Sequence, residues 1–372
     1  MPRLVFLTDL HLNEGTDSAA RFARDLAEIR ALDPPPDLLA FGGDICLWSD
    51  GALDLFRDLL GDCPIPQLHA MGNHDTTLDV PVDQAGRDFE AAFNPVSAHR
   101  RLGEAHVIAL NTCAMDPAYI GSRDWHNVLG WVPDADLAWL EQTLSAIEDR
   151  DAPLIIFTHI PFFSTYPDRL DAGQAERDVW VVGNAQRVVD LLRPFGNCTV
   201  LQGHLHENEH LWVEGIHFVS VGAIGGAWWS GQGFAECVDG AARGYLVADI
   251  RGRDVALQYR AAGCSPEYRA CSFAAEGRPY LNLFFADARA AVEVQHNNTW
   301  VSLQRDTELI MRGRWTSAHT WALPDEVAQA GGSGATRIAP LTVRTHLDGR
   351  EDLLESVPFD ELYMADPTDR RR

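Results

Sequence analysis

The sequence predicts an α/β protein whose sheets are covered by helices, followed by a small all-β region. Three observations lead to this prediction. Apolar runs of strand length alternate with amphipathic helical patterns over the first 262 residues. Five of these runs end in Asp, Asn or His, which are residue types that bind metal ions. Beyond Gly263 the chain holds short β-like runs and no long amphipathic helix.

Seven apolar runs have the length and the composition of buried strands. They are rich in Val, Ile, Leu and Phe, and they lie at 3–9, 37–44, 67–75, 106–112, 153–161, 199–206 and 217–226. Helical patterns separate several of them, at 18–32, 136–149 and 184–195. Ser18 opens the first helix and Asn184 the last, and both residue types cap helix N-termini. This alternation is typical of sheets covered by helices.

The region after Gly263 has a different texture. Short β-like runs lie at 279–286, 290–295, 300–305 and 341–347, and a glycine-rich break lies at 330–335. We therefore expect two domains, an α/β domain over residues 1–262 and a small all-β domain over residues 263–372. Long loops at 113–135 and 163–183 are expected to border the substrate site, because long loops in α/β enzymes commonly carry function.

The composition excludes several classes of function. The net charge of −24 argues against non-specific binding to nucleic acid, which needs a basic surface. All 30 basic residues are arginine, so the chain has no lysine for a Walker A motif or a Schiff base. Seven cysteines without a CxxC pair indicate reduced thiols. Because no apolar run is long enough to span a membrane and the start has no signal-peptide layout, we expect a cytoplasmic protein.

Five strand ends carry the candidate metal-binding residues. In open α/β sheets ligands bind beyond the carboxyl ends of the strands, so we expect these residues to meet at one rim. His204 and His206 are two residues apart, and in an extended segment they would point to the same side. Carboxylate, amide and imidazole ligands without thiolate suit Mn, Fe, Zn or Ni, and there are enough of them for two ions. The residues are Asp9, His11, Asp44, Asn73, His74, Asp75, His159, His204 and His206.

The motifs D-x-H, G-D, G-N-H-D, H and G-H-x-H, in this order, resemble those of the calcineurin-like metallophosphoesterases. This resemblance covers residues 3 to about 262. The segments "GAIGGAWWSGQGF" and "DGAARGYLVADIRGRDVALQYRAAG" further resemble the bacterial branch of the family that carries a C-terminal β-sandwich domain. The resemblance implies a four-layer α/β/β/α sandwich for the first domain and a β-sandwich for the second.

The resemblance also implies a role for each position of the motifs. His74 matches the family's acid, which binds the phosphate or protonates the leaving alkoxide. We predict that Asp75 orients His74, as a carboxylate commonly does for an imidazole. The family often has another Asp three residues after the bridging one, where this chain has Leu47. The implied ligands are Asp9, His11 and His206 for one ion and Asn73, His159 and His204 for the other, with Asp44 as the bridge.

Other residues are candidates for substrate contacts. Arg123 and Arg177 lie in the two long loops, where a guanidinium could bind a phosphate oxygen or a second phosphate. Trp228 and Trp229 follow the last strand of the predicted catalytic sheet. They could form a wall of the substrate pocket or pack inside the protein, and the sequence favours neither role.

The implied function is that of a two-metal phosphoesterase. A metal-bridging hydroxide would attack the phosphorus in line while the ions stabilise charge on the phosphoryl oxygens. The first hypothesis is a phosphodiesterase that acts on small diesters or cyclic nucleotides. A phosphomonoesterase of the same mechanism and a non-catalytic, metal-stabilised interaction module remain open, as do the metal, the natural substrate and the oligomeric state. The expected partner is a small-molecule phosphoester substrate, and no association with a membrane is expected.

Overall fold

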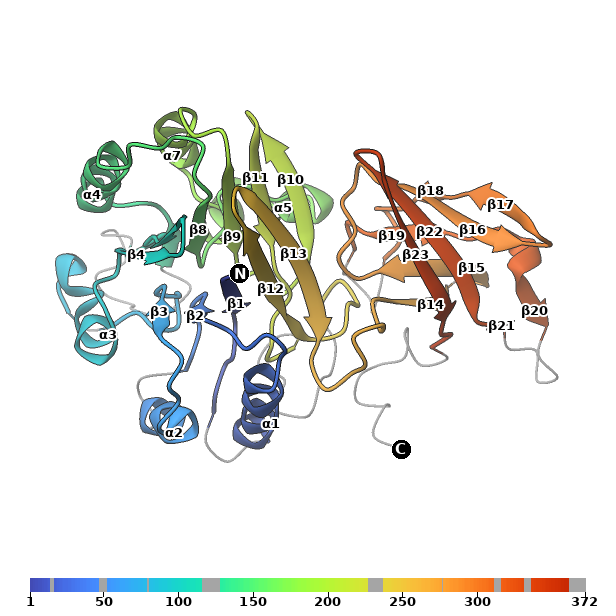
Figure 1. Cartoon of the computed structure of the whole chain (residues 1–372), viewed down its shortest axis with the longest axis horizontal. Helices are drawn as coiled ribbons and strands as arrows, with labels where there is room; N and C mark the ends of the chain where they lie inside the picture. The colour runs from blue at the N-terminus through green and yellow to red at the C-terminus, as the bar shows by residue number, and fades with distance from the viewer. Residues whose placement is uncertain are drawn as a thin grey trace.

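Two mixed sheets form the first part of the molecule (Figure 1). The computed structural model describes residues 1–13, 17–46, 52–78, 80–115, 128–226, 237–275, 277–310, 316–330 and 336–360. The first sheet has the strand order β13-β12-β1-β2-β3, and the second has the order β10-β11-β9-β8-β5-β4. The strands β1 to β3 are mutually parallel, and so are β5, β8, β9 and β11.

The strands of the two sheets are short. Those of the first sheet are β1 (Arg3–Leu7), β2 (Leu38–Phe41), β3 (Gln67–His69), β12 (Gly244–Arg251) and β13 (Asp254–Ala261). Those of the second are β4 (Ala98–Leu102), β5 (Ala105–Ala109), β8 (Leu154–Thr158), β9 (Cys198–Gln202), β10 (Glu209–Val213) and β11 (Ile216–Ser220). All seven predicted strands form, and the five that precede predicted metal-binding residues each end before those residues.

The sheets pack face to face with helices on both outer faces (Figure 1). Along β1 the side chains alternate, so that Phe6 packs against Phe157 of the other sheet at a centroid distance of 5.8 Å, while Val5 and Leu7 face the helices. The helices α1 (Ser18–Arg30) and α2 (Ala52–Leu60) cover the first sheet. The helices α4 (Asp134–Ser145) and α7 (Ala185–Leu192) cover the second. The predicted α/β/β/α layering is therefore confirmed.

The remaining elements of this part are shorter. They are η2 (Val82–Gln84), α3 (Arg87–Ala92), the hairpin of β6 (Cys113–Met115) and β7 (Val128–Gly130), α5 (Tyr166–Arg169) and α6 (Gln174–Trp180). Within the described residues, no helix has the length and the apolar character needed to cross a membrane.

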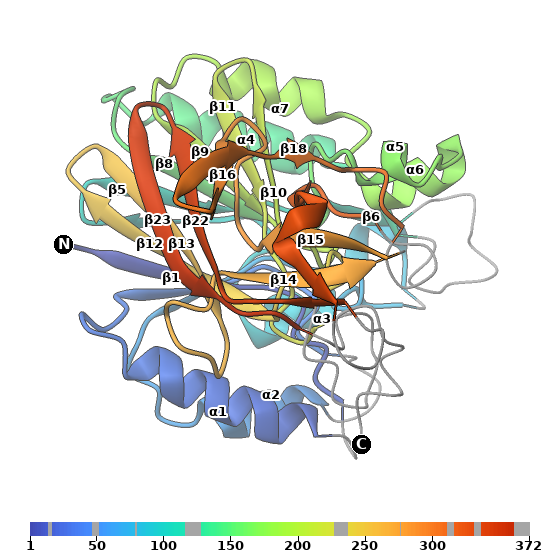
Figure 2. The ribbon, with the colours of Figure 1, turned by 90° about the vertical axis from the view of Figure 1, so that its right-hand side faces the viewer.

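The C-terminal part contains two further four-stranded sheets, which Figure 2 views from their own side of the molecule. One has the order β14-β15-β19-β18 and the other β17-β16-β22-β23. Their strands are β14 (Ala270–Ala275), β15 (Arg278–Leu283), β16 (Ala291–His296), β17 (Thr299–Ser302), β18 (Gln304–Arg305), β19 (Thr320–Ala322), β22 (Leu341–Leu347) and β23 (Arg350–Val357).

A small apolar core lies between these two sheets, with Leu281, Trp321 and Val343 among its residues. η5 (Asp325–Val327) and the short strand pair of β20 (Ala328–Ala330) and β21 (Thr336–Ile338) complete this part. On the α/β side, Phe273 and Tyr280 belong to the same apolar cluster as β1 and β12 residues, so the two parts share buried surface. The domain boundary after residue 262 stays a prediction.

Candidate metal centre

The loops that follow β1, β2, β3, β8 and β9 bring the predicted metal-binding residues together. Three overlapping groups of side chains have ligand atoms within 4.8 Å of one another. The groups are Asp9, His11 and His206; His11, Asp44 and His74; and Asp44, His159 and His204. Because His11 and Asp44 each belong to two groups, the residues form one continuous centre rather than separate clusters.

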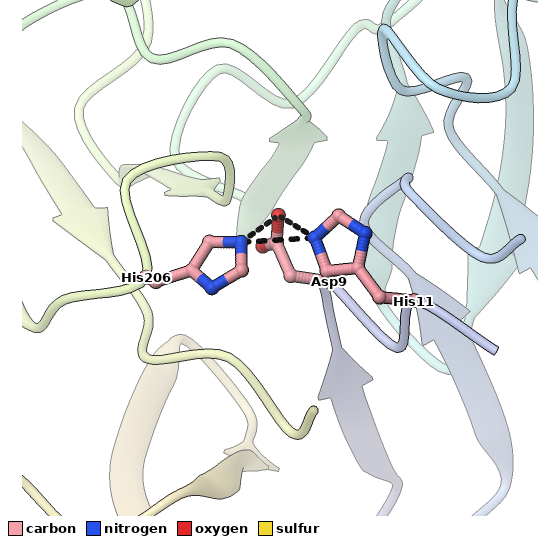
Figure 3. A group of neighbouring side chains, drawn as sticks. All are labelled: Asp9, His11 and His206. Atoms are coloured by element: carbon pink, nitrogen blue, oxygen red, sulfur yellow. Dashed lines mark hydrogen bonds and ion pairs between the residues drawn. The ribbon is translucent and has the colours of Figure 1, made fainter. Parts of the chain in front are cut away.

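The first group converges from two loops far apart in the sequence (Figure 3). The Nε2 atoms of His11 and His206 lie 3.0 Å apart. The Oδ1 atom of Asp9 lies 3.2 Å from Nε2 of His206 and 3.8 Å from Nε2 of His11. Two imidazoles and a carboxylate with this spacing present three ligand atoms to one point.

The third group, which contains Asp44, His159 and His204, is arranged around Nε2 of His159. This atom lies 3.3 Å from Oδ2 of Asp44, 3.2 Å from Nδ1 of His204 and 3.0 Å from Oδ1 of Asn73. Oδ2 of Asp44 is also 3.7 Å from Nε2 of His11, which belongs to the first group. The Asp44 carboxylate therefore lies between the two groups, as a bridging ligand would.

Backbone carbonyls fix the orientation of three of the imidazoles. Nδ1 of His159 bonds to the Gly42 oxygen at 2.9 Å, and Nδ1 of His206 bonds to the Gly226 oxygen at 2.7 Å. Nε2 of His204 bonds to the Val179 oxygen at 2.9 Å. A carbonyl only accepts, so each of these nitrogens carries the proton and the other nitrogen of each ring turns a lone pair toward the centre. Metal-binding histidines typically have this second partner.

The donor set fits two cations. When His159 is neutral, its Nε2 and Nδ1 of His204 are both lone-pair atoms that face each other at 3.2 Å, which is repulsive unless a cation lies between them. Without a metal ion, a proton on His159 takes the place of that cation, and this agrees with the raised pKa of His159. Among the described residues, Oδ1 of Asp9 is buried and accepts no hydrogen bond. Buried polar atoms are nearly always satisfied, so this oxygen also indicates a missing positive partner.

The backbone at the centre is strained. Asp9, His11, Asp44, His204 and His206 have φ angles of 56°, 47°, 52°, 72° and 54°. Residues other than glycine rarely adopt this left-handed region, and such strain gathers at functional sites. The prediction that His204 and His206 converge through the alternation of an extended strand is therefore wrong. β9 ends at Gln202, and two left-handed turns of the backbone direct the rings instead.

Glycines allow the loops to approach one another closely. A Cβ atom at Gly72 would overlap the backbone nitrogen and the carboxylate of Asp44. A Cβ atom at Gly203 would overlap the hydroxyl of Thr8, which itself donates to Oδ2 of Asp9 at 2.6 Å. The glycines of the G-N-H-D and G-H-x-H motifs are therefore needed for space as well as for conformation.

Burial and charge shift the pKa values of the centre in opposite directions. Burial alone lowers the pKa of His159, but the adjacent Asp44 carboxylate outweighs it and raises this pKa to about 9. Burial, and then the neighbouring His159, lower the pKa of His204 to about 3. Burial also lowers the pKa of His74, which Asp44 only partly offsets. One cationic ring beside neutral ones is the pattern expected where a proton occupies a cation's place.

Asp75 contacts the backbone of two loops. Its Oδ2 accepts from the Gly72 N–H at 2.9 Å, and its Oδ1 accepts from the Ile45 and Cys46 N–H groups at 3.0 and 3.4 Å. Burial and then the nearby Asp44 raise its pKa to about 7. These bonds tie the loop after β2 to the loop after β3, which places Asp44 beside His74. The prediction that Asp75 orients the His74 ring stays a prediction.

The remaining candidates are not part of the described centre. Arg177 of α6 pairs with Asp168 at 2.5 Å and donates to the Ala172 oxygen at 3.1 Å. Leu47, Arg123, Trp228 and Trp229 lie outside the residues that the structure describes.

Sequence reasoning missed the residues that support the loop after β9. Glu207 is fully buried and pairs with Arg169, and Asp239 accepts a hydrogen bond from the Asn208 N–H at 2.7 Å. The acidic residue directly after the G-H-x-H motif was the available signal, because a buried carboxylate needs a partner.

Comparison with known proteins agrees with this geometry. Residues 2–208 match the family described as calcineurin-like phosphoesterase, and residues 219–333 match the family described as the C terminal of calcineurin-like phosphoesterase. No curated protein matches the chain.

Several solved structures are similar to the chain. A dimetal phosphatase from Danio rerio has a TM-score of 0.47 and 13% identity, covering 69% of this chain and 98% of that one. A purple acid phosphatase from yellow lupin (Lupinus luteus) seeds has a TM-score of 0.46 and 14% identity, and the match covers 70% of this chain and 51% of that one. The structure of PhoD has a TM-score of 0.46 and 12% identity, and the match covers 100% of this chain and 75% of that one.

These likenesses are weak, and the assignment rests on the family match over more than half of the chain. The chain belongs to the calcineurin-like phosphoesterases, and it is a metal-dependent phosphoric ester hydrolase of a family that uses a dimetal centre.

Proposed function

We propose that this hydrolase cleaves phosphodiesters, such as small diesters or cyclic nucleotides, with two ions of Mn, Fe or Zn. The donor set supports this choice of metals, because imidazole, amide and carboxylate ligands suit them. The proposed ligands are Asp9, His11 and His206 for one ion and Asn73, His159 and His204 for the other, with Asp44 shared.

The position of His74 carries the proposal. Its Nε2 lies 3.9 Å from Oδ2 of Asp44, and its side chain is 19% exposed while the Asp44 side chain is 2% exposed. A ring at the mouth of the centre can contact a bound phosphate and give a proton to the leaving alkoxide. When bound, the two ions supply Lewis-acid stabilisation of the phosphoryl oxygens and an activated water.

Among the residues that the structure describes, the arginines near the centre support a diester rather than a monoester. α6 adjoins the centre, because the Val179 carbonyl bonds to His204. Arg177 of this helix pairs with Asp168, and Arg169 of α5 pairs with Glu207. Both positive charges are therefore neutralised by carboxylates. A phosphodiester carries one negative charge and a phosphomonoester up to two, so a diester needs less additional positive charge at the site.

A cavity beside the loop after β3 supports a substrate with an organic group. The cavity has a volume of about 870 Å³, and Met71, Cys113 and Trp131 are among its lining residues. Met71 lies two residues before Asn73, and the Cys113 thiol contacts the Met71 carbonyl. Trp131 is 44% exposed and offers an aromatic face. Arg87, Asn111 and the acidic residues Asp83, Glu90 and Asp136 also line the cavity, so it combines apolar and polar walls, as small-molecule sites do.

Hydrolysis of bis-p-nitrophenyl phosphate and p-nitrophenyl phosphate by metal-stripped, Mn-reloaded protein tests the proposal. We expect faster cleavage of the diester, loss of cleavage in Asn73→Ala through loss of a metal ligand, and strong slowing in His74→Ala through loss of the acid. Faster cleavage of the monoester would replace the diesterase proposal with a phosphomonoesterase.

The same experiment addresses the non-catalytic alternative. A metal-stabilised interaction module would bind Mn without cleaving either ester, and His74→Ala would leave its properties intact. Failure to cleave either ester with Mn, Fe or Zn, together with full metal occupancy, would therefore support that alternative.

A further inference from the structure

The conformation of the loop between β9 and β10 depends on contacts with other segments of the chain. It carries His204 and His206, whose φ angles of 72° and 54° are unfavourable for residues with a side chain. The inference below rests on the proposed assignment of these two histidines to different ions. Any shift of the loop would then disturb both ions at once.

One anchor of the loop is a buried ion pair. Glu207, the residue after His206, is fully buried and pairs with Arg169 of α5, whose side chain is 8% exposed. The same guanidinium donates to the carbonyl and the hydroxyl of Thr316, at 3.0 and 2.9 Å. Thr316 belongs to the C-terminal part, just before β19. Arg169 therefore joins α5, the metal-binding loop and the C-terminal part.

A second anchor reaches the loop through Asp239. Oδ2 of Asp239 accepts from the Asn208 N–H at 2.7 Å and lies 2.7 Å from Nε2 of His319. The Val238 N–H donates to the carbonyl of His206 at 3.1 Å. The segment 238–239 therefore bonds both to a proposed metal ligand and to the residue two positions after it.

The orientation of His319 follows from its neighbours. The side-chain amide nitrogen of Asn282 donates to the Asp239 carbonyl at 2.9 Å, so its Oδ1 must be the atom that faces Nδ1 of His319 at 2.7 Å. Both ring nitrogens of His319 thus face acceptors, and both donate. Asn282 lies on β15 and His319 just before β19, so the donor that satisfies Asp239 comes from the C-terminal sheet.

These contacts are sealed from water. Asp239 and Asn282 are fully buried, and His319 is 1% exposed. Removing one partner of a buried charged pair leaves the other uncompensated, and a buried unpaired carboxylate is strongly unfavourable. Asp239 without His319 would therefore turn or draw in water, and the backbone of the loop bonded to it would move.

We propose that the C-terminal part is a component of the metal centre, in which His319 acts as a positioning residue. Through Asp239 and Asn208 it holds the loop that carries His204 and His206, and it thereby sets the affinity for both ions. Arg169, through Glu207 and Thr316, is the second positioning residue of the same loop.

Affinity for Mn²⁺ in the full chain tests the proposal. We expect His319→Ala to weaken Mn²⁺ binding, measured by competition with a chelator, by about 10-fold. This is the lower end of the range for groups that bond a metal ligand directly, because His319 acts through Asp239 and Asn208. Saturating Mn²⁺ should restore most of the activity. His346→Ala is the matched control, because His346 lies on β22 in the same part of the chain and pairs with Glu293 and Glu351 at the surface. We expect it to change the affinity less than twofold.

The result that would overturn the proposal is a His319→Ala affinity within twofold of the unaltered protein, even if the variant melts at a lower temperature. Should this variant fail to fold, His319→Gln keeps one N–H donor toward Asp239 and Arg169→Lys keeps one charge. We expect both to weaken binding less than a full loss of the anchor. Arg169→Met removes the charge but keeps an unbranched side chain, and an affinity within twofold of the unaltered protein in this variant would refute the inference. His206→Ala separates the two hypotheses: retention of both ions refutes the ligand assignment, whereas loss of an ion with normal His319→Ala refutes only the positioning role.

Discussion

At the scale of the residue, His74 differs from the proposed ligands in its exposure. The Asp9, His11, Asp44, His159 and His206 side chains are at most 5% exposed, whereas that of His74 is 19% exposed. We expect His74→Ala to lower kcat by about 10²–10⁴-fold, the usual contribution of a general acid, and to leave two ions bound per chain. Steady-state kinetics and metal analysis of the same sample check this. The exposed His99→Ala on β4 is the control, and an unchanged kcat for His74→Ala would exclude the acid role.

The space at Gly72 leads to a second prediction. We expect Gly72→Ala to lower the free energy of unfolding by about 1–3 kcal/mol and to reduce metal content, because its Cβ atom would displace the Asp44 backbone and carboxylate. Chemical denaturation and metal analysis measure the two effects. Gly173→Ala is the matched control, since a Cβ atom there meets no atom within 4 Å. Normal metal content in Gly72→Ala would show that Asp44 tolerates the shift.

The sequence could predict that these candidate ligands converge at one centre, but it could not predict their geometry. Each candidate follows a strand, and the common rim of parallel strands brings them together. The left-handed turns at His204 and His206 depend on contacts with Asp239 and Gly226, which no local pattern contains. The carbonyl that orients His204 likewise belongs to Val179, on a different element. Long-range contacts of this kind leave no periodic trace in the sequence.

At the scale of the element, β3 makes the fold sensitive to acid. His69 of β3 is stacked between the rings of Phe41 and Phe93, at centroid distances of 4.6 and 4.1 Å. Burial lowers its pKa from 6.5 to about 3. The unfolded chain therefore takes up a proton below about pH 6.5 while the folded chain does not, so this contribution to stability is present above that pH and is lost as the pH falls toward 3.

We expect the free energy of unfolding to fall by about 1.4 kcal/mol per pH unit below pH 6.5 through His69 alone. His69→Phe keeps the stacked ring and removes the titrating group, so its stability should depend less on pH by this amount. Urea denaturation between pH 5 and 7 provides the comparison. Equal slopes for the two proteins would mean that His69 does not carry this effect.

The three helices that were predicted from periodicity are present, but the side chains predicted to cap α1 and α7 make no capping hydrogen bond. Asn184 occupies the N-cap position of α7, yet its side chain bonds to both backbone groups of Val132, at 3.0 and 2.8 Å. The N-cap residue of α1 is Asp17, and the hydroxyl of Ser18 bonds to the backbone of Asn13 instead. For Asn184 a tertiary contact replaced the helix cap, and for Ser18 a contact with a residue five positions earlier did so.

At the scale of the whole molecule, the metal ions are expected to contribute to the stability of the fold. The centre holds the buried carboxylates of Asp9 and Asp44, whose negative charge bound cations would compensate. It also holds five residues with left-handed backbone, whose unfavourable conformation ligand bonds would help to maintain. A ligand at about 1,000 times its Kd stabilises a protein by about 4 kcal/mol. We expect chelation to lower Tm by several degrees and Mn²⁺ to restore it, as thermal melts would show. An unchanged Tm in protein verified to be metal-free would contradict this.

The sequence did not predict the contacts that join the α/β part to the C-terminal part. The all-β character of the C-terminal region followed from its short runs, but nothing in them pointed to the centre. His319 and Asp239 are 80 positions apart, and Arg169 and Thr316 are 147 apart. Pairs so distant are found only once the fold is known.

Because β12 is β1's neighbour in the first sheet, β1 cannot complete its pairing until a strand more than 200 residues later has been synthesised. β1, the strand that leads directly into Asp9, has β2 on one side and β12 (Gly244–Arg251) on the other. As the nascent chain leaves the ribosome, β1 emerges first but keeps a bare edge until β12 arrives, and an unpaired strand edge invites wrong partners. Asp9, the first of the proposed ligands to be translated, is thus among the last to reach its final surroundings, because one edge of β1 stays unpaired until β12 has been made.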